Sequence, residues 1–119
     1  MELHESGEMY LETILLLKEQ YGYVRSIDIA NKMNVSKPSV SRAVGLLKEN
    51  GYITFDPNGM ILLTESGRNV ADKIYERHRV LKQFFISLGV SEETADHDAC
   101  KIEHIISDET FDILKNKIK

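Results

Sequence analysis

The fold is decided by residues 26–63, which read SIDIANKMNVSKPSVSRAVGLLKENGYITFDPNGMILL. We predict a short helix over 26–32, capped by Ser26, because serine is favoured at the residue that starts a helix. A second helix is predicted over 38–50, since Pro38 lies in a first helical turn, where a missing N–H costs nothing. The residues between the two helices form a tight turn, so the pair is typical of a helix-turn-helix.

A hairpin is predicted directly after the second helix. Gly51 ends that helix, and short strands are expected at 52–55 and 60–63. The turn Asp56-Pro57-Asn58-Gly59 joins them, because proline fixes φ and Asn-Gly tolerates positive φ. An amphipathic helix over 8–20 comes before the quoted stretch. This order of elements predicts a winged helix-turn-helix. The side chains expected in its core are Tyr10, Ile14, Leu17, Ile27, Ala30, Met33, Val40, Val44 and Leu47.

The remainder of the chain, 64–119, is predicted to be all helical. A long helix is expected over 65–88, a second over 91–106 and a third over 107–119. The fold class is therefore mainly α, with a winged helix-turn-helix DNA-binding domain at 1–63 followed by an all-α domain at 64–119. Apolar side chains near the end of the long helix exceed what one helix can bury, so we expect this domain to form a homodimer. These side chains are Phe84, Phe85, Ile86, Leu88 and Val90.

The composition indicates the size of the folded unit and the cellular compartment of the protein. A chain of 119 residues forms one compact unit or two small subdomains. One cysteine cannot make an internal disulfide, which is typical of a reducing compartment. No apolar run approaches the ~20 residues needed to cross a bilayer, and the first residues lack the basic segment of a secretory signal. We expect a cytoplasmic protein with no membrane partner.

The charge is distributed unevenly. The net charge is −4, but residues 23–48 hold five Lys and Arg against one acidic residue, a local charge of +4. The rest of the chain holds 10 basic and 18 acidic residues, which gives −8. This asymmetry favours one nucleic-acid-binding face and one acidic regulatory half.

The start of the second helix of a helix-turn-helix usually reaches base edges in the major groove. In this position Arg42 suits the O6 and N7 atoms of guanine, and Pro38 could contact a thymine methyl group. A Ser-Lys-Pro-Ser run is also an ordinary exposed helix start, so the sequence leaves that alternative open. The residues expected to contact double-stranded operator DNA are Arg25, Ser36, Lys37, Pro38, Ser39, Ser41 and Arg42.

A second group of residues indicates a metal site. Cys100, Glu103 and His104 would share one face of the helix predicted over 91–106, and their thiolate, carboxylate and imidazole suit a divalent transition metal. His78 lies in the apolar stripe of the long helix. A lone inward histidine is more often a hydrogen-bonded core residue, but the ligand-type residues on another helix favour a metal. Met9 and Glu12, by themselves, could equally be a core methionine and a solvated acid. A DNA-binding module with a metal site suggests a metal-sensing transcriptional regulator.

With these residues in place, the chain resembles the diphtheria toxin repressor family of metal-dependent regulators, which includes iron-dependent repressors and shorter manganese transport regulators. The resemblance implies a homodimer joined through the C-terminal helices, with metal binding setting the spacing of two DNA-reading heads. The SH3-like third domain of the iron branch has no counterpart here. The matching stretches are 8–11, 27–51, 63–67, 77–79 and 100–109.

The resemblance also implies a ligand set, with features of both branches. The iron-dependent members use the positions of Met9, Cys100, Glu103 and His104. The manganese branch adds those of Glu12 and His78 in a binuclear site, but has aspartate in place of Met9 and glutamate in place of Cys100. We therefore expect Fe(II) first and Mn(II) next, with other divalent transition metals possible in vitro. The full expected set is Met9, Glu12, His78, Cys100, Glu103 and His104.

A second metal of the iron branch is less well matched. Its glutamate one turn after His78 is Lys82 here, and its histidine before the cysteine is Asp96. His97 is adjacent and could substitute, so Asp96 and His97 are a possible second metal site.

Two other functions fit parts of the pattern. C-x-x-E-H resembles the inverted-zincin motif H-x-x-E-H of zinc hydrolases, although a thiolate replaces one histidine. A winged-helix regulator that does not depend on metal is the other alternative. We expect a regulator rather than an enzyme, with no organic small-molecule substrate.

Overall fold

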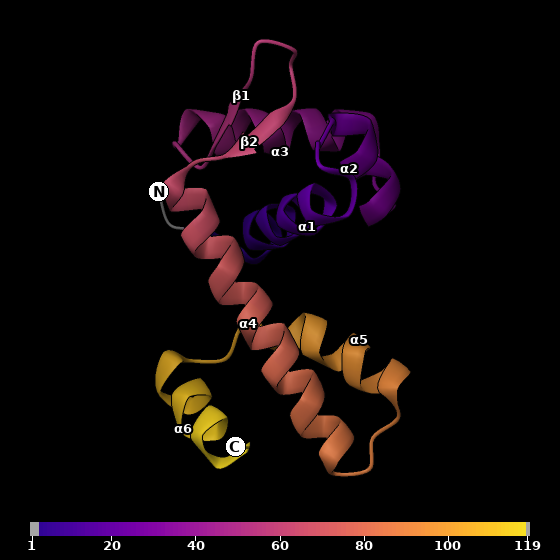
Figure 1. Ribbon diagram of the computed structural model, residues 1–119, viewed down its shortest axis with the longest axis vertical. Helices are drawn as coiled ribbons and strands as arrows, with labels where there is room; N and C mark the ends of the chain where they lie inside the picture. Colours follow the sequence, from indigo (N-terminus) through magenta and orange to yellow (C-terminus); the bar gives the residue numbers. More distant parts are fainter. Residues whose placement is uncertain (1–2, 119) are drawn as a thin grey trace. The chain divides into compact units, whose positions relative to one another are not determined.

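The computed structural model describes residues 3–118. Its secondary structure follows the order of a winged helix-turn-helix continued by helices (Figure 1). The chain divides into two compact units, Met1–Asp72 and Lys73–Lys119. The elements in chain order are α1 (Glu5–Tyr21), α2 (Ser26–Met33), α3 (Lys37–Glu49), β1 (Ile53–Phe55), β2 (Ile61–Leu63), α4 (Glu65–Ser87), α5 (Glu92–Ile102) and α6 (Asp108–Ile118).

The core of the first unit lies where α1, α2, α3 and the hairpin meet. Helix α1 contacts α2, α3 and β2, and α3 contacts β1. Buried apolar side chains from every element meet there, because each helix presents one apolar face. The predicted mainly-α fold with a winged helix-turn-helix is confirmed. The most deeply buried of these side chains are Leu11, Ile14, Leu15, Val24, Ile29, Val40, Ile53 and Ile61.

Two details of α2 differ from the prediction. The residue that caps α2 is Arg25 rather than Ser26, and its backbone N–H donates to Oδ2 of Asp28 over 2.9 Å. The buried residue is Ile29, with 0% of its surface exposed, whereas Ile27 is 36% exposed. Two residues correspond to about 200° around a helix, so a face centred on Ile29 turns Ile27 outward.

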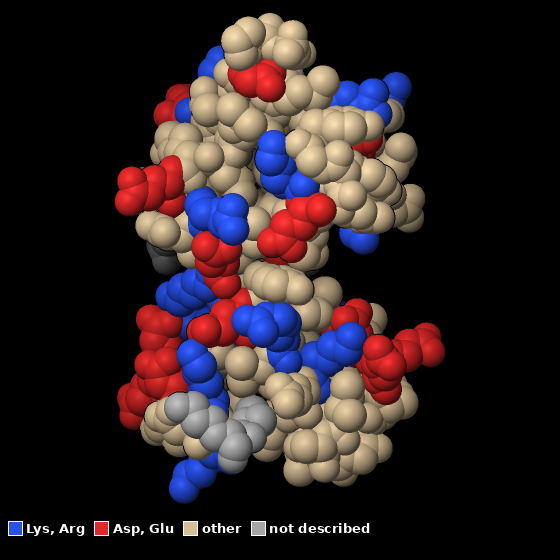
Figure 2. All heavy atoms as spheres, in the orientation of Figure 1, with Lys and Arg blue, Asp and Glu red and all other residues tan. Residues whose placement is uncertain are grey.

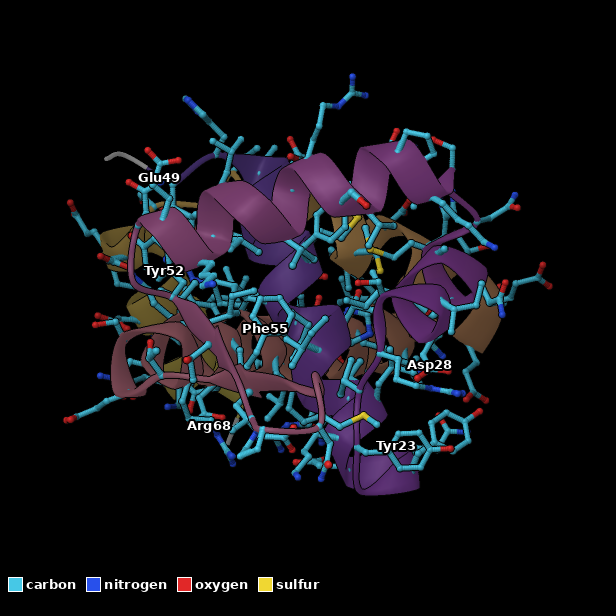
Figure 3. The ribbon with its side chains drawn as sticks, turned by 90° about the horizontal axis from the view of Figure 1, so that it is seen from above. Tyr23, Asp28, Glu49, Tyr52, Phe55 and Arg68 are labelled. Atoms are coloured by element: carbon cyan, nitrogen blue, oxygen red, sulfur yellow. The ribbon has the colours of Figure 1, made fainter. Side chains whose placement is uncertain are left out.

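The wing is an antiparallel pair, with Ile53 opposite Leu63 and Phe55 opposite Ile61. Its turn is held by Asp56, whose Oδ1 accepts backbone N–H groups of Asn58 (2.8 Å) and Met60 (3.0 Å). The strands are shorter by a residue at their ends than predicted. Figure 3 labels Tyr52, the residue before β1, and Phe55, the last residue of that strand.

The wing is fastened to the first turn of α4. Thr64 caps this helix: its Oγ1 accepts from the backbone N–H of Gly67 (3.1 Å) and donates to the carbonyl oxygen of Gly51 (2.6 Å). A Cβ atom on Gly67 would lie 2.0 Å from the carbonyl oxygen of Tyr52. Only glycine permits so close an approach of the two backbones.

The second unit consists of the later part of α4 together with α5 and α6. Its buried side chains include Ile74, Leu81, Ala95, Ala99 and Phe111. The predicted helix over 91–106 is wrong at its end, because α5 stops four residues earlier, at Ile102.

Several large apolar side chains of the second unit are exposed. Leu88, one of the apolar side chains expected to exceed what the long helix can bury, is 66% exposed. Ile105 and Ile113 are exposed as well. Figure 2 shows uncharged side chains gathered around the end of α4, beside mixed acidic and basic groups. Among residues 3–118, no helix is both long and apolar enough to pass through a lipid bilayer.

Candidate metal centre and DNA-binding surface

Helices α4 and α5 of the second unit bring three potential metal ligands together. His78 projects from α4, Cys100 from the last turn of α5, and Glu103 stands at the C-cap of that helix. One ligand atom from each of the three lies within 4.8 Å of the others. The cluster thus joins an imidazole nitrogen, a thiol sulfur and a carboxylate oxygen.

His78 lies between two carboxylates. Its Nδ1 is 3.0 Å from Oε1 of Glu103, and its Nε2 is 3.0 Å from Oδ1 of Asp96. Both ring nitrogens therefore donate protons, as only an imidazolium can. Hydrogen bonds with Cys100 and then with Glu103 raise the pKa of His78 to about 11. The His78 ring therefore carries a positive charge beside the Glu103 carboxylate.

Glu103 is the most deeply buried member of the cluster, with 0% of its surface exposed. While Oε1 accepts the hydrogen bond from His78, the other oxygen, Oε2, is buried and has no hydrogen-bond partner among the described residues. Burying an unsatisfied carboxylate oxygen is costly, so such an atom calls for an explanation. A divalent cation beside Oε2 would satisfy it, and the nitrogen, sulfur and oxygen donors fit a transition metal.

The C-x-x-E-H motif spans the end of α5 and does not lie on one continuous helix. Because the helix stops at Ile102, Glu103 and His104 do not continue one helical face with Cys100. His104 lies in the turn that follows, and one of its ring nitrogens is within 4.8 Å of a carboxylate oxygen of Glu103. Glu103 is thus adjacent to both histidines of this unit's expected ligand set.

The other expected ligands, Met9 and Glu12, lie on α1 in the first unit. Met9 is half-buried and Glu12 is buried. They are one helical turn apart, so their side chains emerge from the same side of α1.

Asp96 and His97, the residues of the possible second metal site, lie in different surroundings. Asp96 bonds His78, and the ammonium group of Lys82 lies 3.4 Å from its Oδ1. Burial would raise the pKa of Asp96, but His78 and Lys82 outweigh it and lower that pKa. The side chain of His97 is 67% exposed, and its Nδ1 lies 3.8 Å from Asp98. Asp96 therefore interacts with His78, whereas His97 is a surface residue.

The expected DNA-binding residues surround the start of α3. Ser36 caps the helix by accepting the backbone N–H of Ser39 (3.3 Å) and donates to the hydroxyl of Ser39 (2.9 Å). Ser39 is half-buried, and the remaining members of this set on α3, which are Lys37, Pro38, Ser41 and Arg42, are exposed. Ser36 therefore has a structural role as the cap of α3, in addition to any contact with DNA.

Arg25 lies at the start of α2. Its Nε is 3.2 Å from Asp28, and its guanidinium lies 5.3 Å from the centre of the Tyr23 ring. Tyr23 and Asp28 lie on the same side of the first unit (Figure 3). The hydrogen bond from Arg25 lowers the pKa of Asp28. The guanidinium is therefore already engaged with a carboxylate.

One buried charged residue was missed by the sequence reasoning. Arg77 is only 6% exposed and lies directly before His78 on α4. The signal was present, because Arg77 follows the buried Ile74 by three residues and precedes the buried Leu81 by four. A charge on the apolar face of a helix needs a polar partner inside the protein.

Models of one protein family match both parts of the chain. Residues 2–60 match the N-terminal DNA-binding domain of iron-dependent repressors, and residues 64–119 match their metal-binding and dimerisation domain. An HTH-type transcriptional regulator of Methanocaldococcus jannaschii is 36% identical over 115 residues, which are 95% of this chain and 92% of that protein. The HTH-type transcriptional regulator MntR of Geobacillus thermodenitrificans is 36% identical over 102 residues, which are 86% of this chain and 72% of that protein.

A solved structure of the manganese regulator SloR superposes with a TM-score of 0.84 at 29% identity. The match covers 99% of this chain and 54% of the SloR chain, so this chain spans about half of that structure.

A winged helix-turn-helix joined to a metal-ligand cluster defines the class of metal-dependent transcriptional regulators. The chain belongs to the iron-dependent repressor family, the family of the diphtheria toxin repressor, as its sequence indicated. Proteins of this family are transcriptional repressors and not enzymes, so the zinc-hydrolase alternative is set aside.

Proposed function

We propose that this protein binds operator DNA as a homodimer when a divalent metal occupies the cluster of His78, Cys100 and Glu103. The observation that supports this most directly is the buried Oε2 of Glu103, which has no hydrogen-bond partner in the described part of the chain. A carboxylate oxygen in that state is prepared to accept a cation. The metal supplies positive charge when bound, and the protein supplies the donors that hold it.

The proposed ligand set extends beyond this cluster. His104 is included because a nitrogen of its ring lies close to the Glu103 carboxylate. Met9 and Glu12 of α1 are included because they match ligand positions of the iron and manganese branches, respectively. We further propose that the DNA-binding domain spans 1–63 and the metal-binding and dimerisation domain spans 64–119.

Fe(II) is our first candidate for the metal, and Mn(II) is the second. The sulfur of Cys100, joined by that of Met9, makes the site softer than one with only oxygen and nitrogen donors, and this favours iron over manganese. Manganese is supported by relatives, since SloR is named as a manganese regulator.

In the proposed mechanism, metal binding by His78, Cys100 and Glu103 is coupled to DNA binding by α3. In a homodimer the two α3 helices would read two half-sites of the operator, with Arg25 and the residues at the start of α3 contacting DNA. Metal and DNA would each strengthen the binding of the other by the same factor, as linkage requires. The exposed apolar side chains of the second unit provide a surface for the dimer.

The test uses the full chain and a DNA site that the metal-loaded protein selects from a random library. DNA affinity is measured without oxygen, with Fe(II), Mn(II), Ni(II) or Zn(II), and again with excess chelator. The wild type should bind this site with Fe(II) or Mn(II) and lose it with chelator. Glu103→Gln should lose the metal dependence, whereas the matched control Glu109→Gln, an exposed carboxylate of α6, should keep it. Direct metal binding by Glu103→Gln with wild-type affinity would refute the proposed site.

A further inference from the structure

Arg77 is bonded to the segment that follows α5. Its Nη1 donates to the carbonyl oxygens of Glu103 (3.2 Å) and Ile106 (2.6 Å). Its Nη2 donates to Oδ1 of Asp108, 2.5 Å away, at the first residue of α6. One guanidinium group therefore bonds to both ends of the turn between α5 and α6.

These hydrogen bonds lie at the place where α5 ends. In a longer helix the carbonyl of Glu103 would accept the backbone N–H of residue 107. Here Arg77 takes that acceptor, and the N–H groups of Ile105 and Ile106 both bond to the carbonyl of Ile102, at 3.0 Å each. The guanidinium thus donates to the carbonyls of Glu103 and Ile106, while the N–H of Ile106 keeps its helical bond to the carbonyl of Ile102.

The contact also fixes Glu103 from two directions. Arg77 holds its backbone carbonyl, and the next residue of α4, His78, holds its side-chain Oε1 at 3.0 Å. Consecutive residues of one helix therefore set the position of the whole glutamate. A shift of this turn would move Oε2 with respect to both His78 and Cys100.

Fold stability alone is a poor reason for an arginine at this position. Its Nε is buried and has no hydrogen-bond partner among the described residues. Buried ion pairs are often no more stabilising than apolar side chains of similar size. The ring of Phe111, 5.5 Å from the guanidinium carbon, would pack as well against methionine. What methionine could not supply is the pair of hydrogen bonds to the two carbonyls of the turn.

We propose that Arg77 is a positioning residue for the metal site, acting through the turn 103–107 to place the Glu103 carboxylate against His78 and Cys100. The inference rests on the proposed function, in which Glu103 binds the metal. Arg77 itself touches no metal in this arrangement. Its planar fork binds two carbonyls and a carboxylate at once, which a lysine ammonium cannot reproduce.

The test measures Mn(II) affinity of the full chain by calorimetry, together with the thermal unfolding and the backbone chemical shifts of the metal-free protein. Arg77→Met should weaken Mn(II) binding by about ten- to hundredfold, the usual effect of losing a group that orients a ligand. Its metal-free form should remain folded, with helical chemical shifts extending from Ile102 into 103–106. Arg77→Lys should bind Mn(II) with intermediate affinity, since it keeps the charge without the fork.

The matched control is Arg79→Met, on the other side of His78. Arg79 is exposed and lies over the ring of Tyr75 at 5.3 Å, so its loss should leave Mn(II) affinity unchanged. Wild-type affinity in Arg77→Lys, or in a folded Arg77→Met, would overturn the inference, as would equal losses in Arg79→Met. If Arg77→Met does not fold, Arg77→Lys decides by itself. Glu103→Gln separates the two proposals: if it loses Mn(II) binding while the Arg77 variants keep it, only the role of Arg77 fails.

Discussion

Oε1 of Glu103 lies 3.0 Å from Nδ1 of His78, deep in the second unit. The pair joins a carboxylate to an imidazolium, and Asp96 is a second carboxylate on the other side of the His78 ring. A cation that binds there has to displace a proton. In the proposed function, the metal-bound and metal-free forms would differ in which positive charge lies beside the Glu103 carboxylate.

Metal binding should release protons. The pKa of His78 is raised to about 11, so the ring is protonated at neutral pH and must lose a proton to become a ligand. The apparent affinity for Mn(II) should rise as the pH is raised towards that pKa. Calorimetry in buffers with different ionisation enthalpies measures the released protons. His97→Asn, at an exposed histidine, is the control and should release as many as the wild type. Heats that do not depend on the buffer would show that His78 stays protonated.

The donor atoms should determine metal preference. Replacing Cys100 with Glu and Met9 with Asp exchanges two sulfur donors for oxygen donors, which suit manganese better than iron. We expect the ratio of Mn(II) to Fe(II) affinity to increase, measured by competition without oxygen. Glu109→Asp, which alters an exposed carboxylate of α6, is the control and should leave the ratio unchanged. An unchanged ratio would mean that these two sulfur atoms do not bind the metal.

Two residues of α3 should affect DNA binding in different ways. Arg42→Ala should cost ~1–3 kcal/mol and relax specificity at one base pair if the side chain reads a guanine. Lys37→Ala should weaken binding to all sequences alike and reduce the salt dependence by about one unit of slope, as expected for a phosphate contact. Competition titrations at several salt concentrations distinguish the two. If neither variant changes binding, α3 does not read the operator.

The first unit should be far more sensitive at Ile29 than at Ile27. Ile29→Ala removes a side chain with no exposed surface and should destabilise the protein by ~2–5 kcal/mol. Ile27→Ala, at a position 36% exposed, should change stability by about 1 kcal/mol or less. Urea unfolding of the metal-free protein measures both. Equal losses would place Ile27 in the core, as the sequence first suggested.

The contact between Arg25 and Asp28 should make stability depend on pH in the acid range. The hydrogen bond from Arg25 lowers the folded-state pKa of Asp28 below its ordinary value of 3.8. The stabilisation is therefore present above pH 3.8 and lost as the pH falls through the folded-state pKa. Asp28→Asn should lower stability by ~0.5–1 kcal/mol at neutral pH, with the difference vanishing in acid. A difference that persists in acid would point to a cause other than charge.

The winged helix-turn-helix could be predicted because its signals are local. Pro38 and Gly51 mark the ends of α3, and the spacing of Val40, Val44 and Leu47 describes its buried face correctly. The turn at 56–59 contains the residues that its backbone needs. Each of these features depends on neighbours within a few positions along the chain.

The end of α5 could not be predicted in this way. The turn that follows it is bonded to Arg77, which is 26 residues from Glu103 in the sequence and bonds to it only in the folded protein. The sequence around Ile102 contains no glycine or proline, so a helix through Ile106 was the natural local prediction. Under the role proposed for Arg77, the same long-range contact would also affect how Cys100, Glu103 and His104 are arranged. The residue types of the ligands were therefore easier to predict than their geometry.

Gly67 leaves no space between the start of α4 and the residue that leads into β1. A single added carbon would collide with the Tyr52 carbonyl at 2.0 Å, and Thr64 adds a hydrogen bond to Gly51. The base of the hairpin is therefore packed directly against the first turn of α4. A motion of the first turn of α4 would therefore carry the base of the wing with it.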